Sequence, residues 1–582
     1  MKKYIKFLSG ILALSILLVS ACGCGDKGKT STVKKPPKSQ EASQNQASTS
    51  SDDNSSSDDI FPSDDTSIDV SDDFKSDDFG SDDFGDLDMD DFDFDLTTNQ
   101  VFTFSKSPVR SNIKGTGGIL PCWWYFPDST IDGGYSESDI QIAVEQLKNM
   151  NVSIVRCLSF QPGYAWDEAS GSYNWDSVYM KAFYRYAKVL KDNGMEIVIN
   201  PNRNLADPQA GEPTCTPFKK ASDAKNEDEY NRLYGEWIVE LIKEVIIKRG
   251  FTNIKYLMYN TEANNIGDVK ADNEAAYFAE HKKYFDLYMG RIKASDKAMR
   301  DAGVRNYLKI VGPNAVTAPT AKGYEKYCGK RWLEWAVQYG NDCIDIYSAH
   351  FYAYLTDYTQ DAYNDLLKQE QEFVEIVKPT GKEFWHDEFN TMKQGYSSAT
   401  EKEDDPLQAT TLASMVMAMY EGGAQSSMLW YLFDVKWPES DLTAPPERFE
   451  GIHYGGVCPV SYESTIPYTA YYMWCALGSA IRSGDTVYVG TTDGENFHSM
   501  LLKHVDGTYS IVAVNITWDK TNVTFNLPVS LGGKEFTKTV YDPTTVTPTT
   551  EYKPLEPTGK VKLTNSFKDT IGSYQVVVYN QK

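Results

Sequence analysis

The stretch Asn253-Ile-Lys-Tyr-Leu-Met-Tyr-Asn-Thr-Glu-Ala-Asn-Asn265 joins a short apolar run to an abrupt polar end. Its residues 254–259 have the length and composition of a buried strand, and Glu262 stands just beyond that strand. A second stretch of the same form, Lys382-Glu-Phe-Trp-His-Asp-Glu-Phe-Asn390, places Glu388 at the end of another short strand. One such glutamate alone would be an ordinary surface residue. Two carboxylates that each end a strand, and that the fold brings to the same edge, can act together as a proton donor and a nucleophile or base.

Around these two stretches, short apolar strands alternate with amphipathic helical segments from about residue 101 to residue 481. Strands that are apolar on both faces, each followed by a helix, predict a parallel sheet that is covered on both sides. Eight such repeats predict an α/β fold, a closed (β/α)8 TIM barrel with enlarged loops. The predicted strands are 118–122, 153–157, 196–199, 254–259, 308–311, 344–347, 383–385 and 427–431, and the predicted helices are 138–150, 175–193, 227–249, 273–302, 324–339, 360–377 and 406–421.

Beyond the barrel, from residue 487 to residue 579, the pattern changes to short alternating strands with turns such as Asp493-Gly and Asp506-Gly. This pattern predicts a C-terminal β-sandwich, to which a strand at residues 101–105 is expected to contribute. We expect the sandwich to support the barrel rather than to act as an independent sugar-binding module. The predicted organisation is a signal peptide at 1–22, a disordered linker at 23–99, the catalytic barrel at 100–482 and the sandwich at 483–582.

The first 22 residues form a predicted targeting segment. Three lysines precede an apolar run at residues 11–19 that is too short to span a bilayer as a stable helix. The run ends in Val19-Ser20-Ala21-Cys22, which resembles the bacterial lipobox, where the cysteine thiol carries the lipid after cleavage. A plain secretory signal, cut at a small-residue site, is the alternative. The resemblance implies that Cys22 is lipidated and that a lipid anchor holds the mature protein at the bacterial cell surface.

Residues 23–99 lack the apolar side chains that a hydrophobic core requires. Between residues 51 and 96 the chain carries 19 Asp and one Lys, and the block supplies −18 of the formal net charge of −25. A Ser-Asp-Asp-Phe repeat begins at Ser71, Ser76 and Ser81. This composition predicts a disordered, self-repelling stalk. Loose calcium binding is the alternative, but the block contains no Asp-x-Asp-x-Asp-Gly loop with a Glu at its twelfth position.

The remaining composition argues against several other classes of protein. Without the acidic block the net charge is about −7, and no basic patch or aromatic-arginine stripe indicates nucleic-acid binding. The chain has nine cysteines, and those beyond residue 100 show no Cys-x-x-Cys spacing. No metal site and no organic cofactor is therefore predicted. The sequence leaves the oligomeric state open.

The order of strands and carboxylates resembles clan A of the glycoside hydrolases, which are retaining enzymes on a (β/α)8 barrel. In that clan the acid/base glutamate ends strand four and the nucleophile glutamate ends strand seven, the positions of Glu262 and Glu388 here. The stretches 253–257, 309–313 and 344–350 are most similar to the β-xylosidase and α-iduronidase type of family. The resemblance implies a carbohydrate substrate for this chain.

Other residues of this sequence match positions that support catalysis in the clan. Arg156, at the end of the second strand, resembles the arginine that supports the nucleophile. Ser348-Ala-His350-Phe-Tyr352 resembles the clan's His-x-Tyr element, so His350 and Tyr352 are expected in the site. Trp430, on the eighth strand, resembles its sugar-stacking aromatic residue. Asn202, after the third strand, is a further candidate for a sugar contact.

The chain departs from the clan directly before the acid/base glutamate. The clan usually has Asn there, in contact with the sugar 2-hydroxyl, whereas this chain has Thr261. Either Thr261 makes a weaker contact, or Asn260 or Asn264 takes over the contact, or the sugar has an unusual 2-substituent.

The sequence thus predicts a retaining glycoside hydrolase that acts on an oligo- or polysaccharide at the cell surface, with Glu262 as acid/base and Glu388 as nucleophile. An inactive carbohydrate-binding lipoprotein on the same barrel is the alternative, and the presence of both glutamates argues against it. The mechanism leads us to expect a raised pKa at Glu262 and an ionised Glu388 beside Arg156. Strand alternation predicts that Asp387 points to the side opposite Glu388.

Overall fold

The computed structural model describes most of the chain from residue 97 onward. The described residues are 97–120, 122, 135–201, 205, 213–266, 269–317, 328–354, 359–392, 406–436, 452–453, 456–459, 464–528, 531 and 533–582. The predicted signal peptide, Cys22, nearly all of the predicted linker and Asn202 therefore lie outside the described residues.

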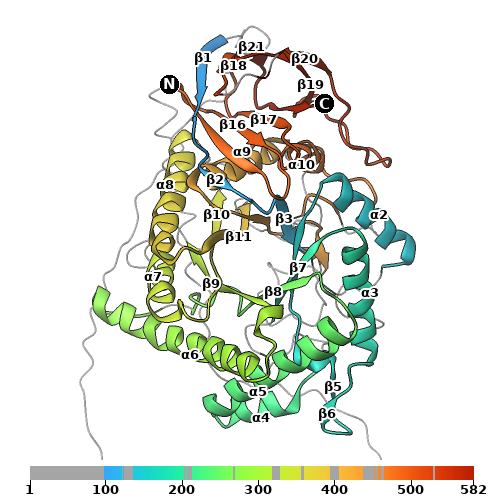
Figure 1. Ribbon diagram of the computed structural model, residues 1–582, viewed down its shortest axis with the longest axis vertical. Helices are drawn as coiled ribbons and strands as arrows, with labels where there is room; N and C mark the ends of the chain where they lie inside the picture. Colours follow the sequence, from blue (N-terminus) through green and yellow to red (C-terminus); the bar gives the residue numbers. More distant parts are fainter. Residues whose placement is uncertain are drawn as a thin grey trace, which may run out of the picture. The chain divides into compact units, whose positions relative to one another are not determined.

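Eight parallel strands close into a barrel, in the order β10-β11-β12-β3-β4-β7-β8-β9, so each strand pairs with its neighbours in the chain and the last pairs with the first. Figure 1 shows this ring almost end-on. All eight predicted barrel strands are present, which confirms the predicted fold class. Their bounds are β3 Thr116–Ile119, β4 Ile154–Leu158, β7 Glu196–Asn200, β8 Ile254–Met258, β9 Lys309–Thr317, β10 Ile346–Tyr354, β11 Glu383–Met392 and β12 Ser427–Leu429.

Helices surround the outside of the ring (Figure 1), and seven of them fall where the amphipathic periodicity predicts them. The helices Thr216–Asp223 and Thr469–Ala480 were not predicted. Their side chains and those of the strands fill the space between the two layers, so both faces of the sheet are covered. The helices are α2 Glu137–Asn149, α3 Val178–Asp192, α4 Thr216–Asp223, α5 Glu227–Leu241, α6 Glu274–Asp301, α7 Cys328–Gly340, α8 Gln360–Val377, α9 Pro406–Gly422 and α10 Thr469–Ala480, with a π-helical continuation of α5 at Ile242–Lys248.

The inside of the barrel is a packed core rather than a channel, as in other barrels of this size. Inward-facing side chains of the strands form a cluster of their own in the middle of the barrel, and each is almost completely shielded from solvent. The polar side chains of the candidate site follow these residues at the carboxyl ends of the strands. The members of this inner cluster are Ile154, Val198, Tyr256, Met258, Val311, Ile346, Trp385 and Met428.

The β-sandwich combines strands from both ends of the described chain. Strand β1, Thr97–Phe104, lies between β15 and β18, antiparallel to the first and parallel to the second. This confirms that the segment around residues 101–105 is a strand of the sandwich. The sheet order is β20-β19-β22-β17-β16-β15-β1-β18-β21. The C-terminal strands are β15 Thr486–Thr491, β16 Phe497–Lys503, β17 Tyr509–Asn515, β18 Lys520–Asn526, β19 Lys534–Tyr541, β20 Gly559–Leu563, β21 Ser566–Ile571 and β22 Val576–Gln581.

Five minor strands complete the assignment. Strand β2 pairs with β15 of the sandwich. The other four minor strands form two separate two-stranded sheets. Within the described residues, no helix combines the length and apolar character needed to cross a membrane. The minor strands are β2 Arg110–Ser111, β5 Trp166–Asp167, β6 Ser172–Tyr173, β13 Val435–Lys436 and β14 Ile452–His453, with β5 paired to β6 and β13 to β14.

Candidate active site

Most of the described candidate residues meet at the carboxyl ends of the barrel strands, the end at which barrel enzymes carry their sites. Each neighbouring strand contributes one or two polar side chains to this end. They are Arg156 from β4, Asn200 from β7, Thr261 and Glu262 after β8, Asn314 from β9, His350 and Tyr352 from β10, Asp387 and Glu388 from β11, and Trp430 after β12.

Glu388 is buried and held by two donors. Its carboxylate lies 2.5 Å from Nη1 of Arg156, and the Tyr352 hydroxyl donates a hydrogen bond to its other oxygen. Arg156 is fully buried and is fixed in turn by Asn200, whose Oδ1 accepts from Nε at 2.8 Å. A buried arginine without a carboxylate partner would be costly, so Arg156 and Glu388 stabilise each other in place.

A bulge in β11 brings two consecutive carboxylates to the same side of the strand. In the pairing of β11 with β10, Ala349 pairs with His386 and the next residue, His350, pairs with Glu388. Asp387 therefore has no pairing partner on β10. Asp387 is fully buried, its Oδ2 accepts a hydrogen bond from Asn314 at 2.7 Å, and its Oδ1 lies 3.3 Å from Nε2 of His350. The prediction that Asp387 points away from Glu388 is therefore wrong, because regular alternation does not continue through a bulge.

Glu262 lies on a tight turn after β8 and remains partly accessible. Its φ angle is +48°, and its backbone N–H donates to Oδ1 of Asn314 at 2.9 Å. Its side chain is 23% exposed, and Nδ2 of Asn265 donates to it at 3.2 Å. A non-glycine residue in the left-handed region is uncommon and is typical of functional turns.

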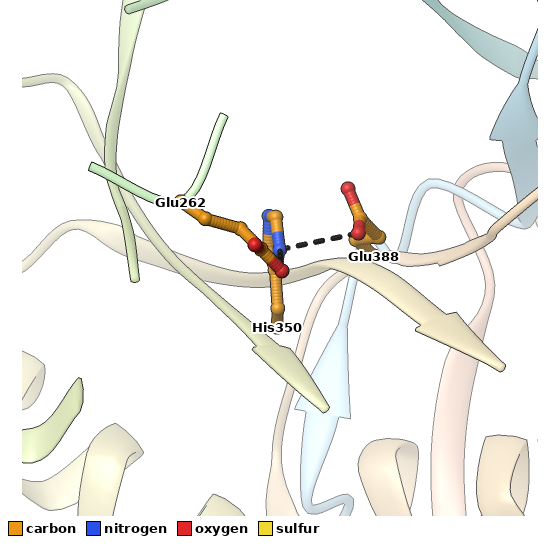
Figure 2. Close-up of side chains that lie close together, drawn as sticks. All are labelled: Glu262, His350 and Glu388. Atoms are coloured by element: carbon orange, nitrogen blue, oxygen red, sulfur yellow. Dashed lines mark ion pairs between the residues drawn. The ribbon is translucent and has the colours of Figure 1, made fainter. Parts of the chain in front are cut away.

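His350 lies between the two glutamates, as Figure 2 shows. Its Nδ1 is 3.5 Å from Glu262 and 3.4 Å from Glu388, and its ring is completely buried. One ligand atom from each of the three residues lies within 4.8 Å of the other two, which limits the separation of the nearest carboxylate oxygens to that distance. The two carboxylates are therefore neighbours in space although 126 residues separate them in the sequence.

The charges in this group shift each other's pKa values. Burial raises the pKa of Glu388, and the Glu262 charge adds to this, so that the pKa lies above its ordinary value although His350 and Arg156 oppose the shift. Burial also acts to raise the pKa of Glu262, but His350 and Asn265 together hold that pKa below its ordinary value. Burial acts to lower the pKa of His350, but the charges of Glu388 and Asp387 outweigh burial, so this pKa lies above its ordinary value.

This order of the two carboxyl pKa values is opposite to the one expected from the sequence. The physical reason is that hydrogen bonds and the charge of His350 outweigh burial at Glu262, whereas burial outweighs the charges of His350 and Arg156 at Glu388.

Thr261, which stands where the clan has Asn, belongs to the arginine network. Its hydroxyl accepts a hydrogen bond from Nη2 of Arg156 at 3.0 Å and donates one to Oδ1 of Asn200 at 3.0 Å. Because the hydroxyl already donates its one proton to Asn200, it can only accept in any further hydrogen bond. Asn260 precedes it with a φ of +48°, and Oδ1 of Asn260 is buried without a hydrogen-bond partner among the described residues.

Asn264 and Trp430 are two other residues for which a sugar contact is predicted. Asn264 is not brought into the carboxylate group; its side-chain amide forms reciprocal hydrogen bonds with the backbone of Val316, both 2.8 Å long. A sugar contact would require Asn264 to give up these bonds. Trp430 is half-buried beside Tyr431, with ring centroids 4.2 Å apart, and its carbonyl accepts from Asn390.

Glu262, His350 and Glu388 also form a possible donor set for a metal ion. One imidazole and two carboxylates suit a divalent transition metal such as zinc. However, the Arg156 guanidinium already neutralises Glu388 at 2.5 Å and would repel a cation. The arrangement therefore suits carboxylate chemistry better than a resident metal.

Sequence reasoning did not include three residues that the structure places in the site. Asn200 orients Arg156, Asn314 binds both the Glu262 backbone and Asp387, and Asp387 lies beside His350. All three are polar residues at or near the carboxyl end of a barrel strand. That position is the signal that would have identified them.

Comparison with known proteins supports the fold. No family model and no curated protein matches the chain. Among solved structures, a GH30 endoxylanase from Clostridium papyrosolvens C71 is 14% identical with a TM-score of 0.52, and the match covers 83% of this chain and 100% of that one. A family 51 α-L-arabinofuranosidase from Bifidobacterium longum is 14% identical with a TM-score of 0.51, covering 84% and 100%. An α-L-arabinofuranosidase from Thermotoga maritima is 13% identical with a TM-score of 0.54, covering 83% and 99%. The chain shares the fold of these glycoside hydrolases.

Proposed function

We propose that this chain, on a fold shared with glycoside hydrolases, is a retaining glycosidase with Glu388 as nucleophile and Glu262 as general acid/base. The observation that carries the proposal is the separation of no more than 4.8 Å between the nearest oxygens of the two carboxylates. Retaining enzymes hold their carboxyl groups about 5–5.5 Å apart, and inverting enzymes about 6.5–9.5 Å apart to admit a water. The short separation favours the retaining reaction.

The surroundings of each glutamate suggest which role it takes. Glu388 is rigidly held by Arg156 and Tyr352, as a nucleophile that must attack the anomeric carbon along one line should be. Glu262 sits on a turn and remains partly accessible, so it can reach a leaving-group oxygen and later a water. In the first step Glu388 bonds to the anomeric carbon while Glu262 gives its proton to the departing oxygen. In the second step Glu262 takes a proton from water, which displaces Glu388.

A bound sugar would change the pKa order found in the free site. A sugar ring between the carboxylates would remove water from the 23% exposed side chain of Glu262, and loss of water raises a carboxyl pKa. That is the direction a proton donor requires. Arg156 and Tyr352 remain beside Glu388, where they favour its ionised form.

We further propose that the substrate is an oligo- or polysaccharide met outside the cell. The similar structures include an endoxylanase and arabinofuranosidases, so pentose-containing polysaccharides are the first to test. The lipobox-like sequence at Cys22 supports attachment at the cell surface. An inactive sugar-binding protein on the same barrel is the second candidate, and Thr261 in place of Asn is the observation in its favour.

Azide rescue with an activated aryl glycoside tests both roles. Glu388→Ala and Glu262→Ala should each lose hydrolysis of ordinary glycosides. With azide, Glu262→Ala should form a glycosyl azide of retained configuration, because azide attacks the glycosyl–Glu388 intermediate. Glu388→Ala should instead form the azide of inverted configuration by direct attack. Wild-type activity in both variants, or no hydrolysis of any glycoside in a broad panel by the unaltered chain, would refute the proposal.

A further inference from the structure

The sandwich presents an aromatic pair to solvent. Trp518, in the turn between β17 and β18, is 66% exposed, and among the described residues no other tryptophan is comparably exposed. Tyr574, in the turn between β21 and β22, lies beside it with ring centroids 4.8 Å apart and ring planes at 66°. The two rings form a corner on the surface, and most of the indole remains open to solvent.

The two turns are fastened to each other. The Tyr574 N–H donates to the Thr517 carbonyl at 3.1 Å, and Nδ2 of Asn515 donates to the carbonyls of Asp519 and Gly572, both at 2.8 Å. Tyr574 has a φ of +49°, a region that glycine tolerates and a tyrosine rarely adopts. A strained backbone that holds an aromatic side chain beside an exposed tryptophan indicates a functional position.

The aromatic pair lies at the same end of the molecule as the candidate active site. The Tyr574 carbonyl accepts from the hydroxyl of Thr410, near the start of α9, at 2.6 Å. In the same region, the Asn496 N–H donates to Gln360, the first residue of α8, and the Ile516 N–H donates to the Asn496 carbonyl. Helices α8 and α9 begin where β10 and β11 end, which is the rim that carries His350 and Glu388.

We propose that Trp518 and Tyr574 form a second sugar-binding site, outside the catalytic barrel, that holds a polysaccharide chain at the catalytic end of the molecule. The sugar class rests on the proposed function. The C–H face of a sugar ring is weakly positive and stacks on the negative face of an indole. The neighbouring hydroxyl and carboxylate of Thr517 and Asp519 suit the hydroxyl rim of such a ring. A single aromatic corner is too small for a stable protein interface.

Affinity electrophoresis of the full chain in gels containing xylan, arabinan or β-1,6-glucan measures the binding. All variants carry Glu388→Gln so that hydrolysis does not remove the polymer. Trp518→Ala should weaken retardation about tenfold, as loss of a central aromatic anchor does. Trp518→Phe keeps a stacking face and should change retardation by less than about threefold. Val505→Ala is the matched control, because Val505 is 80% exposed and packs against Gly484 at the opposite end of the barrel; its retardation should be unchanged.

A kinetic comparison with Glu388 restored separates this site from the catalytic one. Trp518→Ala should hydrolyse a small aryl glycoside like the unaltered chain and lose activity only on the polymer, through a higher KM. Unchanged polymer retardation in Trp518→Ala, or no retardation of the parent chain by any of the three polymers, would overturn the proposal. If Trp518→Ala keeps polymer retardation but loses binding to liposomes, the proposal is overturned and the aromatic pair is a membrane contact. If the variant instead loses self-association, the proposal is overturned and the pair is a contact with a second copy of the chain.

The two proposals fail differently in these experiments. If no glycoside is hydrolysed but Trp518→Ala still loses polymer retardation, the second site stands and the proposed enzyme does not. If hydrolysis is normal and Trp518→Ala binds polymer normally, the enzyme stands and the second site does not.

Discussion

At the scale of single residues, Thr261 shows how a substitution in a site is accommodated by its neighbours. The threonine hydroxyl joins the buried Arg156 to Asn200, so it helps to hold the arginine that faces Glu388. The sequence identified Thr261 as a departure from the clan but not its partners, because these arrive from two other strands. Asn260, beside Thr261, has a buried side-chain oxygen without a hydrogen-bond partner among the described residues, so under the proposed function it is the next residue to test for a contact with the sugar 2-position.

Thr261→Val keeps the shape of the side chain and removes the hydroxyl. We expect kcat/KM to fall by about one to two orders of magnitude, because the buried Arg156 guanidinium loses a hydrogen-bond acceptor next to Glu388, the proposed nucleophile. Thr261→Ser retains the hydroxyl and should stay close to the unaltered chain. Steady-state kinetics on one aryl glycoside decides the matter. Near-normal activity in Thr261→Val together with a severe loss of activity in Asn260→Ala would show that Asn260, and not Thr261, provides the hydrogen bond on which activity depends.

At the scale of secondary-structure elements, α10 is one of the helices that join the barrel to the sandwich. It packs against α9 on one side and against β17, β19 and β22 of the sandwich on the other. Gly478 in this helix approaches the backbone of the barrel, and a Cβ there would lie 2.1 Å from the Met150 carbonyl oxygen. No rotamer change can relieve a contact between a Cβ and a backbone atom.

Gly478→Ala should therefore destabilise the protein by a few kcal/mol, although alanine favours a helix by about 1 kcal/mol over glycine. Gly290→Ala in α6 is the matched control, because its added Cβ would meet only the flexible side chain of Asn231. That variant should be neutral or slightly stabilised. Urea unfolding of both variants measures the difference, and equal midpoints for the two would contradict the close approach.

The same elements show what the sequence could and could not predict. The barrel strands were predictable because each is a short apolar run that stops at polar residues. Helix α10 was missed because it is buried on every face and so has no amphipathic periodicity. Strands β19, β20 and β21 are difficult to locate from the sequence because their alternation is diluted by exposed and half-buried positions. The position of Asp387 could not be predicted, because the bulge that turns it inward is set by pairing with β10 rather than by local sequence.

At the scale of the whole molecule, a histidine links the stability of the barrel–sandwich contact to pH. His498 of β16 stacks on Tyr363 of α8, with centroids 3.5 Å apart and planes at 11°. Burial lowers the pKa of His498 to about 3. The folded protein thus keeps this ring neutral, whereas the unfolded chain binds a proton below about pH 6.5. Since the unfolded state binds more protons between these two values, stability must fall as the pH decreases from about 6.5 towards 3.

His498→Phe keeps a ring on Tyr363 and removes the titrating group. Between pH 7 and pH 5 the unaltered chain should lose about 2 kcal/mol more unfolding free energy than His498→Phe, from about 1.5 pH units at 1.36 kcal/mol each. Urea unfolding at the two pH values gives both numbers. An equal loss in the two proteins would show that His498 is not buried as a neutral ring.

The position of β1 determines how mechanical load enters this protein. A pull on the chain ahead of residue 97 reaches β1 first, before any part of the barrel. Its parallel ladder with β18 has seven registered residue pairs, from Thr97 with Lys520 to Thr103 with Asn526. Force along the strand loads those hydrogen bonds together, in shear, rather than opening them one at a time from an end. A pull on the chain ahead of residue 97 would therefore be borne first by the ladder between β1 and β18 in the sandwich, and only after that ladder by the strands of the barrel.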